Sequence, residues 1–347
     1  MERNKKYLAM AAGICIGAGA IIAGIGFGLG GRPGFYVNAS GIHSYNSDDN
    51  SANRLEKTRL EAFSTINMNI PGGDIHIIPS DDYYIEYDLT VQSGKVVCDV
   101  ADGTFTMEAA DSKWINFFSF GNFTSDDKNY VNLYVPTDQV FELVAIDASV
   151  GDVEIGAIKA KSMDLALDLG DLHMEDFEGN SFVADLSCGF MKAASIDSKT
   201  VVLENDMGDI FCESITAEHT ELTLNAGDLD IGTLSTGDLS VENDMGNVSF
   251  DRLESTGEGS IFLDCGDLTA RECTFTRLEI SNNLGNIDLE LTGTIDDYQM
   301  DLVTDLGSIS VPGYNRGDLS SHFVSQNKEG AVLDVSNNCG DISLTFK

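Results

Sequence analysis

The chain has 347 residues, 42% of them hydrophobic, and its 57 acidic against 20 basic residues give a formal net charge of −37. This apolar content is enough to bury a core and excludes a fully disordered chain. The charge argues against binding to nucleic acid or to an anionic lipid surface, which would repel it. The charge is compatible with cations and basic partners as ligands. The alternative is that it only keeps a long β surface soluble.

The first segments of the chain predict its compartment. Residues 1–6 form a basic flank, and residues 7–31 follow without a charge. At about 1.5 Å per residue, a helix of this length crosses a hydrocarbon core of about 30 Å. The basic flank predicts a cytoplasmic N-terminus, so we expect a single-pass anchor in the cell membrane with an extracytoplasmic C-terminal domain. A cleaved signal peptide, the alternative, would have a shorter apolar stretch.

Two further segments precede the repeats. Residues 32–62 are polar and predict a flexible stalk, with a short helix near Leu55–Phe63. Residues 63–143 contain several strand-like runs and predict an N-terminal β cap with the first coil. The run Gly73-Asp74-Ile75-His76-Ile77 already matches the later repeat.

Residues 144–347 contain a repeat of roughly 19 residues centred on glycine. Aliphatic residues recur two and four positions after the glycine and five before it, which is typical of short strands stacked coil on coil. The glycine predicts the corner between strands. We therefore expect an all-β protein with a parallel β-solenoid, a right-handed β-helix of about ten coils. The turn glycines are Gly151, Gly170, Gly189, Gly208, Gly227, Gly246, Gly266, Gly285, Gly307 and Gly340.

The last interval differs from the others. Gly307 and Gly340 are 33 residues apart, which predicts an extruded loop around Pro312–Gly330.

Leucine and asparagine alternate three residues before the glycine, as in Leu224, Asn243 and Leu263. The asparagines are interpreted either as caps of free backbone groups at the corner or as relics of duplication.

Three cysteines, Cys188, Cys265 and Cys339, directly precede a glycine. We expect them, like Cys212, to point inward as buried free thiols. Cys265 and Cys273 are the one local pair for which a disulfide stays open.

Carboxylates flank the glycine corner on both sides and are the strongest candidate for chemistry. Unit charges about 5 Å apart repel by about 0.8 kcal/mol even at the dielectric constant of water. Calcium would relieve that repulsion with oxygen ligands; the alternative is that Asp and Asn only cap the turn. The candidate cation edge comprises Asp168, Asp171, Asp206, Asp209, Asp228, Asp264 and Asp267.

A second candidate is an aromatic cluster that includes the only tryptophan. It is interpreted either as a contact patch for a partner or membrane, or as a cover for the open end of the solenoid. The cluster consists of Trp114, Phe117, Phe118, Phe120 and Phe123.

The order of these features resembles the bacterial putative-adhesin family, a β-strand-repeat domain of unknown function. The resemblance is carried by an N-terminal anchor, the run Asn69-Ile70-Pro71-Gly72-Gly73-Asp74, a Val135-Pro136 step and the repeated Gly-Asp-aliphatic units. It implies a surface-exposed β-solenoid and, in some members, association with cell-envelope stress systems. It supplies no catalytic residues.

The function predicted from these features is a membrane-anchored adhesion or interaction scaffold for a surface, envelope or host ligand, with a cationic ligand suited to the charge. A regulatory component of an envelope-stress response is one alternative, and a carbohydrate-active β-helix protein is another. We expect no enzyme, because the histidines are scattered and no nucleophile turn is present. No cofactor is expected, and calcium at the carboxylate edge is the one alternative left open.

Overall fold

The computed structural model describes residues 34–38, 41–44, 52–90, 96–109, 118–121, 129–318, 320–325, 327 and 329–347. The chain divides into two compact units. The described part of the smaller unit is an antiparallel sheet in the order β2-β1-β9. Its strands are β1 (Gly34–Asn38), β2 (Gly41–Ser44) and β9 (Phe118–Gly121). The predicted anchor, residues 7–31, lies outside the described residues, and no helix among those described has the length and apolarity to span a bilayer.

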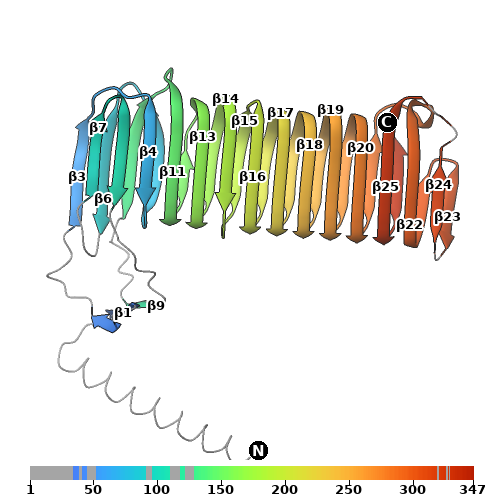
Figure 1. The fold of residues 1–347 in the computed structure, drawn as a ribbon, viewed down its shortest axis with the longest axis horizontal. Coiled ribbons are helices and arrows are strands. Elements are labelled where there is room, and N and C mark those ends of the chain that lie inside the picture. The colour runs from blue at the N-terminus through green and yellow to red at the C-terminus, as the bar shows by residue number, and fades with distance from the viewer. Residues whose placement is uncertain are drawn as a thin grey trace, which may run out of the picture. The chain divides into compact units, whose positions relative to one another are not determined.

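The larger unit is a continuous stack of β coils (Figure 1). At its N-terminal end lie β3 (Ala52–Arg59), β4 (Thr65–Ile70), β5 (Asp74–Ser80), β6 (Tyr84–Thr90), β7 (Val96–Ala101), β8 (Thr104–Ala109), β10 (Tyr130–Pro136) and β11 (Val140–Val150). The regular coils follow with β12 (Val153–Ile155), β13 (Ile158–Leu169), β14 (Leu172–Leu186), β15 (Met191–Asp197), β16 (Thr200–Met207), β17 (Ile210–Ala226), β18 (Leu229–Met245), β19 (Val248–Cys265), β20 (Leu268–Leu284) and β21 (Ile287–Leu291). The C-terminal end contains a short 3-10 helix, η1 (Ile295–Asp297), and β22 (Tyr298–Val311), β23 (Tyr314–Asp318), β24 (Ser321–Val324), β25 (Ala331–Cys339) and β26 (Ile342–Phe346).

Neighbouring coils pair in parallel, which confirms the predicted stack of coils. In β18 and β19, Leu229 lies opposite Val248 and Val241 lies opposite Ile261. All four side chains are buried, as the period-two pattern predicts. Each coil therefore buries its apolar columns against the coils above and below it.

The corner glycines are required by the close approach of consecutive coils. Gly227 donates its N–H to Met245 O at 2.9 Å, and a Cβ on Gly227 would lie 1.9 Å from Gly208 O. No side chain fits at that distance from a backbone oxygen, so the glycine column follows from the coil spacing.

The first coil is formed by β4 and β5, as the early repeat unit predicts. Ile75 in β5 pairs with Val153 in β12, while β10 and β8 pair in parallel with β5 and β4 on the other side. The end is filled by aromatic rings: Phe63 lies 4.6 Å from Tyr83, 5.3 Å from Phe105 and 6.1 Å from Phe141 between ring centroids. These aromatics fill the core at the N-terminal end of the stack.

The short helix expected near Leu55–Phe63 is wrong. Residues 52–59 form β3, which pairs with β6, so at least this part of the predicted stalk is a strand of the larger unit. Lys57 lies over the ring of Tyr134 at 3.5 Å from its centroid, which adds a cation–π contact to the pairing.

The extruded loop expected around Pro312–Gly330 is also wrong. This segment contains β23 and β24, which pair antiparallel with β22 and cover its otherwise open edge. The chain then returns, and β25 and β26 enter between two earlier coils: Ile342 pairs with Ile287 on one side and with Ile309 on the other. In Figure 1, β25 accordingly lies between β20 and β22. The order of the coils in space thus differs from their order in the sequence.

Candidate functional site

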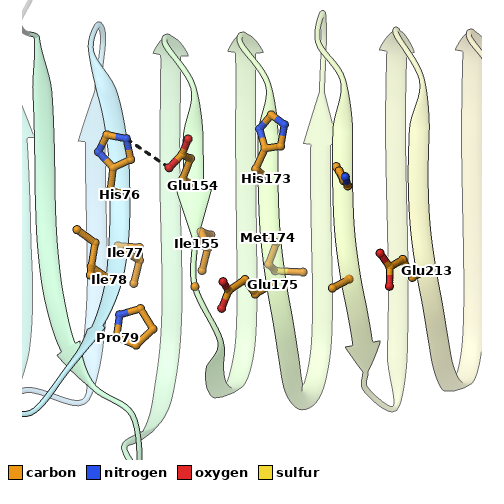
Figure 2. Close-up of a pocket in the computed structure, with 13 residues that line it drawn as sticks. His76, Ile77, Ile78, Pro79, Glu154, Ile155, His173, Met174, Glu175 and Glu213 are labelled. Atoms are coloured by element: carbon orange, nitrogen blue, oxygen red, sulfur yellow. Dashed lines mark ion pairs between the residues drawn. The ribbon is translucent and has the colours of Figure 1, made fainter.

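A groove of about 510 Å³ lies on one side of the larger unit, across β5, β12, β14, β15 and β17. Ile77, Ile155 and Met174 are almost fully buried and form its floor. The hollow arises because Gly156 and Ala194 alternate with Glu175 and Glu213 in one column of the surface. Figure 2 shows the glutamates and histidines along its edge.

His76 is the best-positioned polar group of the groove. Its Nδ1 lies 2.8 Å from Asn132 Oδ1, and its Nε2 lies 3.7 Å from Glu154 Oε2 (Figure 2). The amide oxygen of Asn132 accepts a hydrogen bond from the protonated form of Nδ1, and Nε2 faces the carboxylate of Glu154. Glu154, His173 and Lys192 follow in register on successive coils. The groove therefore combines an apolar floor with an edge of one carboxylate, two imidazoles and one ammonium group, which suits contact with a mixed polar and apolar ligand.

This groove could hardly be predicted from the sequence. His76, His173 and Lys192 are separated by nearly 100 or nearly 20 residues, and only the stacking brings them into one column. The available signal was their common position three residues after the glycine.

The predicted cation edge is a row of hydrogen bonds between coils. Asp171 N–H donates to Asp152 Oδ1 at 2.9 Å, Asp228 N–H to Asp209 Oδ1 at 2.8 Å, and Asn247 N–H to Asp228 Oδ1 at 2.7 Å. Each Asp or Asn thus satisfies the free amide of the next coil at the corner. This geometry is the turn-capping alternative that the sequence left open.

The other predicted edge residues are also placed by the stack. Asp267 Oδ1 accepts from Asn286 N–H at 2.7 Å, Asp206 accepts from Asn225 at 2.7 Å and Asp264 accepts from Asn283 at 2.5 Å. Asp168 is exposed. Within the described ranges, no three or more His, Cys, Asp or Glu side chains are gathered where they could hold a metal ion. Calcium binding stays a prediction.

The alternating asparagines cap the corner, as one of the two interpretations predicts. Asn205 Nδ2 donates to Gly189 O at 3.0 Å, and Asn243 Nδ2 donates to Gly227 O at 3.1 Å. Both side chains are buried. Their Oδ1 atoms are buried without a hydrogen-bond partner among the described residues, so the cap carries a desolvation cost.

The residues directly before the glycines point outward, which corrects the prediction for three cysteines. Cys265 is exposed, and Cys188 and Cys339 are half-buried. The strand alternation ends at the corner: in β13 and β19 the last two residues are both exposed. We call this column the corner stripe. It consists, in stacking order, of Val150, Leu169, Cys188, Met207, Ala226, Met245, Cys265, Leu284, Cys339 and Leu306.

Two cysteines are buried, and for Cys212 this confirms the predicted apolar filler. Cys212 is buried, and burial raises the pKa of its thiol to about 12. Cys273 is also buried, and its pKa is likewise raised to about 12 by burial. All described cysteines are free, so the local pair Cys265 and Cys273 forms no disulfide.

The side chains of the predicted aromatic patch, Trp114, Phe117, Phe118, Phe120 and Phe123, lie outside the described residues. Its two interpretations therefore stay predictions.

A known family model matches most of the chain. The model of the family Toastrack DUF4097 matches residues 63–256 and 192–345. The two matches overlap, as expected where similar coils align to one repeat model in more than one register. The comparison with curated proteins gives no match.

Several solved structures are similar over most of the chain. One is a putative adhesin from Bacteroides fragilis, with 14% identity, a TM-score of 0.34, and coverage of 83% of this chain and 95% of that one. Another is a putative lipid binding protein from Parabacteroides distasonis, with 10% identity, a TM-score of 0.38, and coverage of 85% and 98%. A third is a putative adhesin from Parabacteroides merdae, with 13% identity, a TM-score of 0.30, and coverage of 85% and 97%.

Proposed function

The chain belongs to the Toastrack DUF4097 family, a domain of unknown function with a β-solenoid-like repeat, and we propose that it is an adhesion or protein-interaction scaffold at the cell surface. In this proposal, residues 7–31 anchor the chain in the cell membrane and the solenoid is extracytoplasmic. The support is the uncharged run with its basic flank. The family assignment supplies no catalytic role.

The observation that carries the proposal is the repetition of one hydrogen-bonded corner along the stack. Gly227 N–H bonds to Met245 O at 2.9 Å, and Asp228 Oδ1 accepts from Asn247 N–H at 2.7 Å. The same contacts recur on coil after coil and fix a single register. Such a stack presents regular columns of side chains over many coils, which suits extended contact with a partner better than a single reaction centre.

The scaffold is tested by photo-crosslinking of the full chain in its own cells. A crosslinking residue replaces one of three exposed residues of the same coil: Glu204, Met207 on the corner stripe, or Glu213 in the groove. We expect at least one position to capture a discrete envelope or surface protein. No capture from any of them, with the chain at the cell surface, contradicts the scaffold.

The proposed topology is tested with the exposed thiol of Cys265. A membrane-impermeant maleimide should label it in intact cells. Labelling only after lysis contradicts an extracytoplasmic solenoid, and the Cys265→Ser variant controls for other thiols.

A carbohydrate-active β-helix is the second candidate, and the groove is the observation that favours it. Glu154, Glu175 and Glu213 lie there with His76 and Lys192, and glycan hydrolysis uses a pair of carboxyl groups as acid and base or nucleophile. Purified full chain should then cleave a polysaccharide, and Glu154→Gln should abolish the cleavage. Absence of cleavage across acidic and neutral glycans removes this candidate.

A further inference from the structure

The corner stripe is an unusual feature of a soluble β surface. Val150, Leu169, Met207, Met245 and Leu284 are each between 52% and 59% exposed. Scattered exposed apolar residues need no explanation, but a continuous row along consecutive coils does. Since these side chains project away from the core, folding gains little from their being apolar.

Both flanks of the corner stripe are acidic. The column before it contains Asp168, Asp206, Asp244, Asp264 and Asp305, all exposed. The column after the glycine contains Asp152, Asp171, Asp209, Asp228, Asp267 and Asp341.

None of the three columns contains Lys or Arg from Val150 to Asp341. In the column after the glycine, the contacts between coils use Oδ1, as at Asp209 and Asp228, so Oδ2 is available to a cation. A second copy of this chain or an anionic lipid would meet like charge there. The partner surface complementary to the corner stripe and its acidic flanks is apolar, with basic groups on both sides.

The distance between successive side chains of the corner stripe favours one secondary structure for the partner's surface. Coils repeat at about 4.8 Å, and the apolar ridge of an α-helix repeats at about 5.4 Å per turn. Over four coils the mismatch is about 2.4 Å, which flexible Met and Leu side chains accommodate. The same-face residues of an extended strand recur at about 6.7 Å and lose register after about two coils.

We propose that the corner stripe is the docking site of a basic amphipathic α-helix from a partner protein, with Lys or Arg on both sides of a single apolar ridge. This proposal rests on the scaffold function and names the chemistry of its partner. The apolar ridge packs on Met207, Met245 and Leu284, and the basic side chains reach the flanking carboxylates.

The test uses the full chain in nanodiscs of zwitterionic lipid and a labelled synthetic helix of about 18 residues, about 27 Å long, with a leucine ridge flanked by lysines. A matched peptide carries Glu in place of Lys. We expect saturable binding of the lysine peptide alone, weakened by salt because the flanking charges are screened. Bound peptide should also slow maleimide labelling of Cys265, which lies between Met245 and Leu284 in the stripe.

The double variant Met245→Ser/Leu284→Ser should weaken the lysine peptide about tenfold, since two apolar contacts are lost. Val140→Ser is the matched control, because Val140 is 52% exposed away from the stripe, and it should leave binding unchanged. Equal binding of both peptides, or unchanged affinity of the double variant, overturns the proposal. A chain that dimerises or binds anionic vesicles only while Met245 and Leu284 are present overturns it as well, in favour of a second copy or lipid.

The crosslinking experiment separates the two claims. Capture of a partner from Glu213 with the double variant as well as with the native chain leaves the scaffold standing and refutes the corner stripe as its docking site. Capture from no position refutes the scaffold itself.

Discussion

Replacing Gly227 with alanine should destabilise the solenoid by about 4–5 kcal/mol. The new Cβ would lie 1.9 Å from Gly208 O, whereas an ordinary carbon–oxygen contact is about 3.3 Å. The two coils must therefore separate locally by about 1.4 Å.

Three backbone N–H groups join these coils at the corner: Gly208 N–H donates to Ala226 O at 2.9 Å, Ile210 N–H to Asp228 O at 2.9 Å, and Asp228 N–H to Asp209 Oδ1 at 2.8 Å. Losing all three hydrogen bonds costs about 3 kcal/mol. The backbone of Gly227, at φ +156°, has a conformation that residues with a side chain rarely adopt, which adds about 1–2 kcal/mol.

The measurement is urea unfolding of the full chain followed by far-UV circular dichroism. Gly313→Ala is the matched control: its φ is +84°, but nothing lies within 4 Å of its Cβ position. It should cost only the backbone strain, about 1 kcal/mol. If Gly227→Ala lowers the free energy of unfolding by no more than this control does, the coils are not held so close that a Cβ at Gly227 meets Gly208 O.

Three further perturbations test the corner and the core. Asp228→Asn should leave the free energy of unfolding unchanged, because an amide oxygen can still accept the Asn247 N–H. Asp228→Ala should lower it by about 1 kcal/mol, because no acceptor remains. Equal losses for the two variants in urea unfolding would contradict the row of hydrogen bonds. Asn243→Leu should lower the free energy of unfolding by about 1 kcal/mol. The variant loses the hydrogen bond to Gly227 O and leaves that carbonyl unpaired, although it also removes the unpaired Oδ1. Unchanged or increased stability would show that the asparagine is a relic of duplication. Burial raises the pKa of the Cys212 thiol from 9.0 to about 12. The folded state therefore holds this proton more tightly than the unfolded state, so its contribution to stability is complete below about pH 9 and is lost as the pH rises toward 12. Unfolding at a series of alkaline pH values should show a shallower fall for Cys212→Ala, and an identical fall would show that the thiol is not the cause.

Much of the fold of this protein could be predicted from local patterns in its sequence. The interval near 19 residues, the aliphatic columns and the corner glycines predict a β-solenoid because each coil repeats the same contacts with its neighbours. The capping role of Asn243 could also be predicted, because short polar side chains at a corner commonly form hydrogen bonds with the nearby backbone. In these cases the chemical cause lies within one repeat.

Tertiary structure decided what depends on which coils meet. The entry of β25 and β26 between earlier coils could not be read from the sequence, since the inward residues Ile287, Ile309 and Ile342 are interchangeable as neighbours. The groove likewise exists only because stacking brings His76 beside Glu154.

The corner stripe shows the same limit most clearly. Strand alternation predicts that Cys265 points inward, but the chain is already turning there, and both Asp264 and Cys265 face solvent. A period-two pattern holds only while the strand continues, and the path of the corner decides the side on which its last side chain lies.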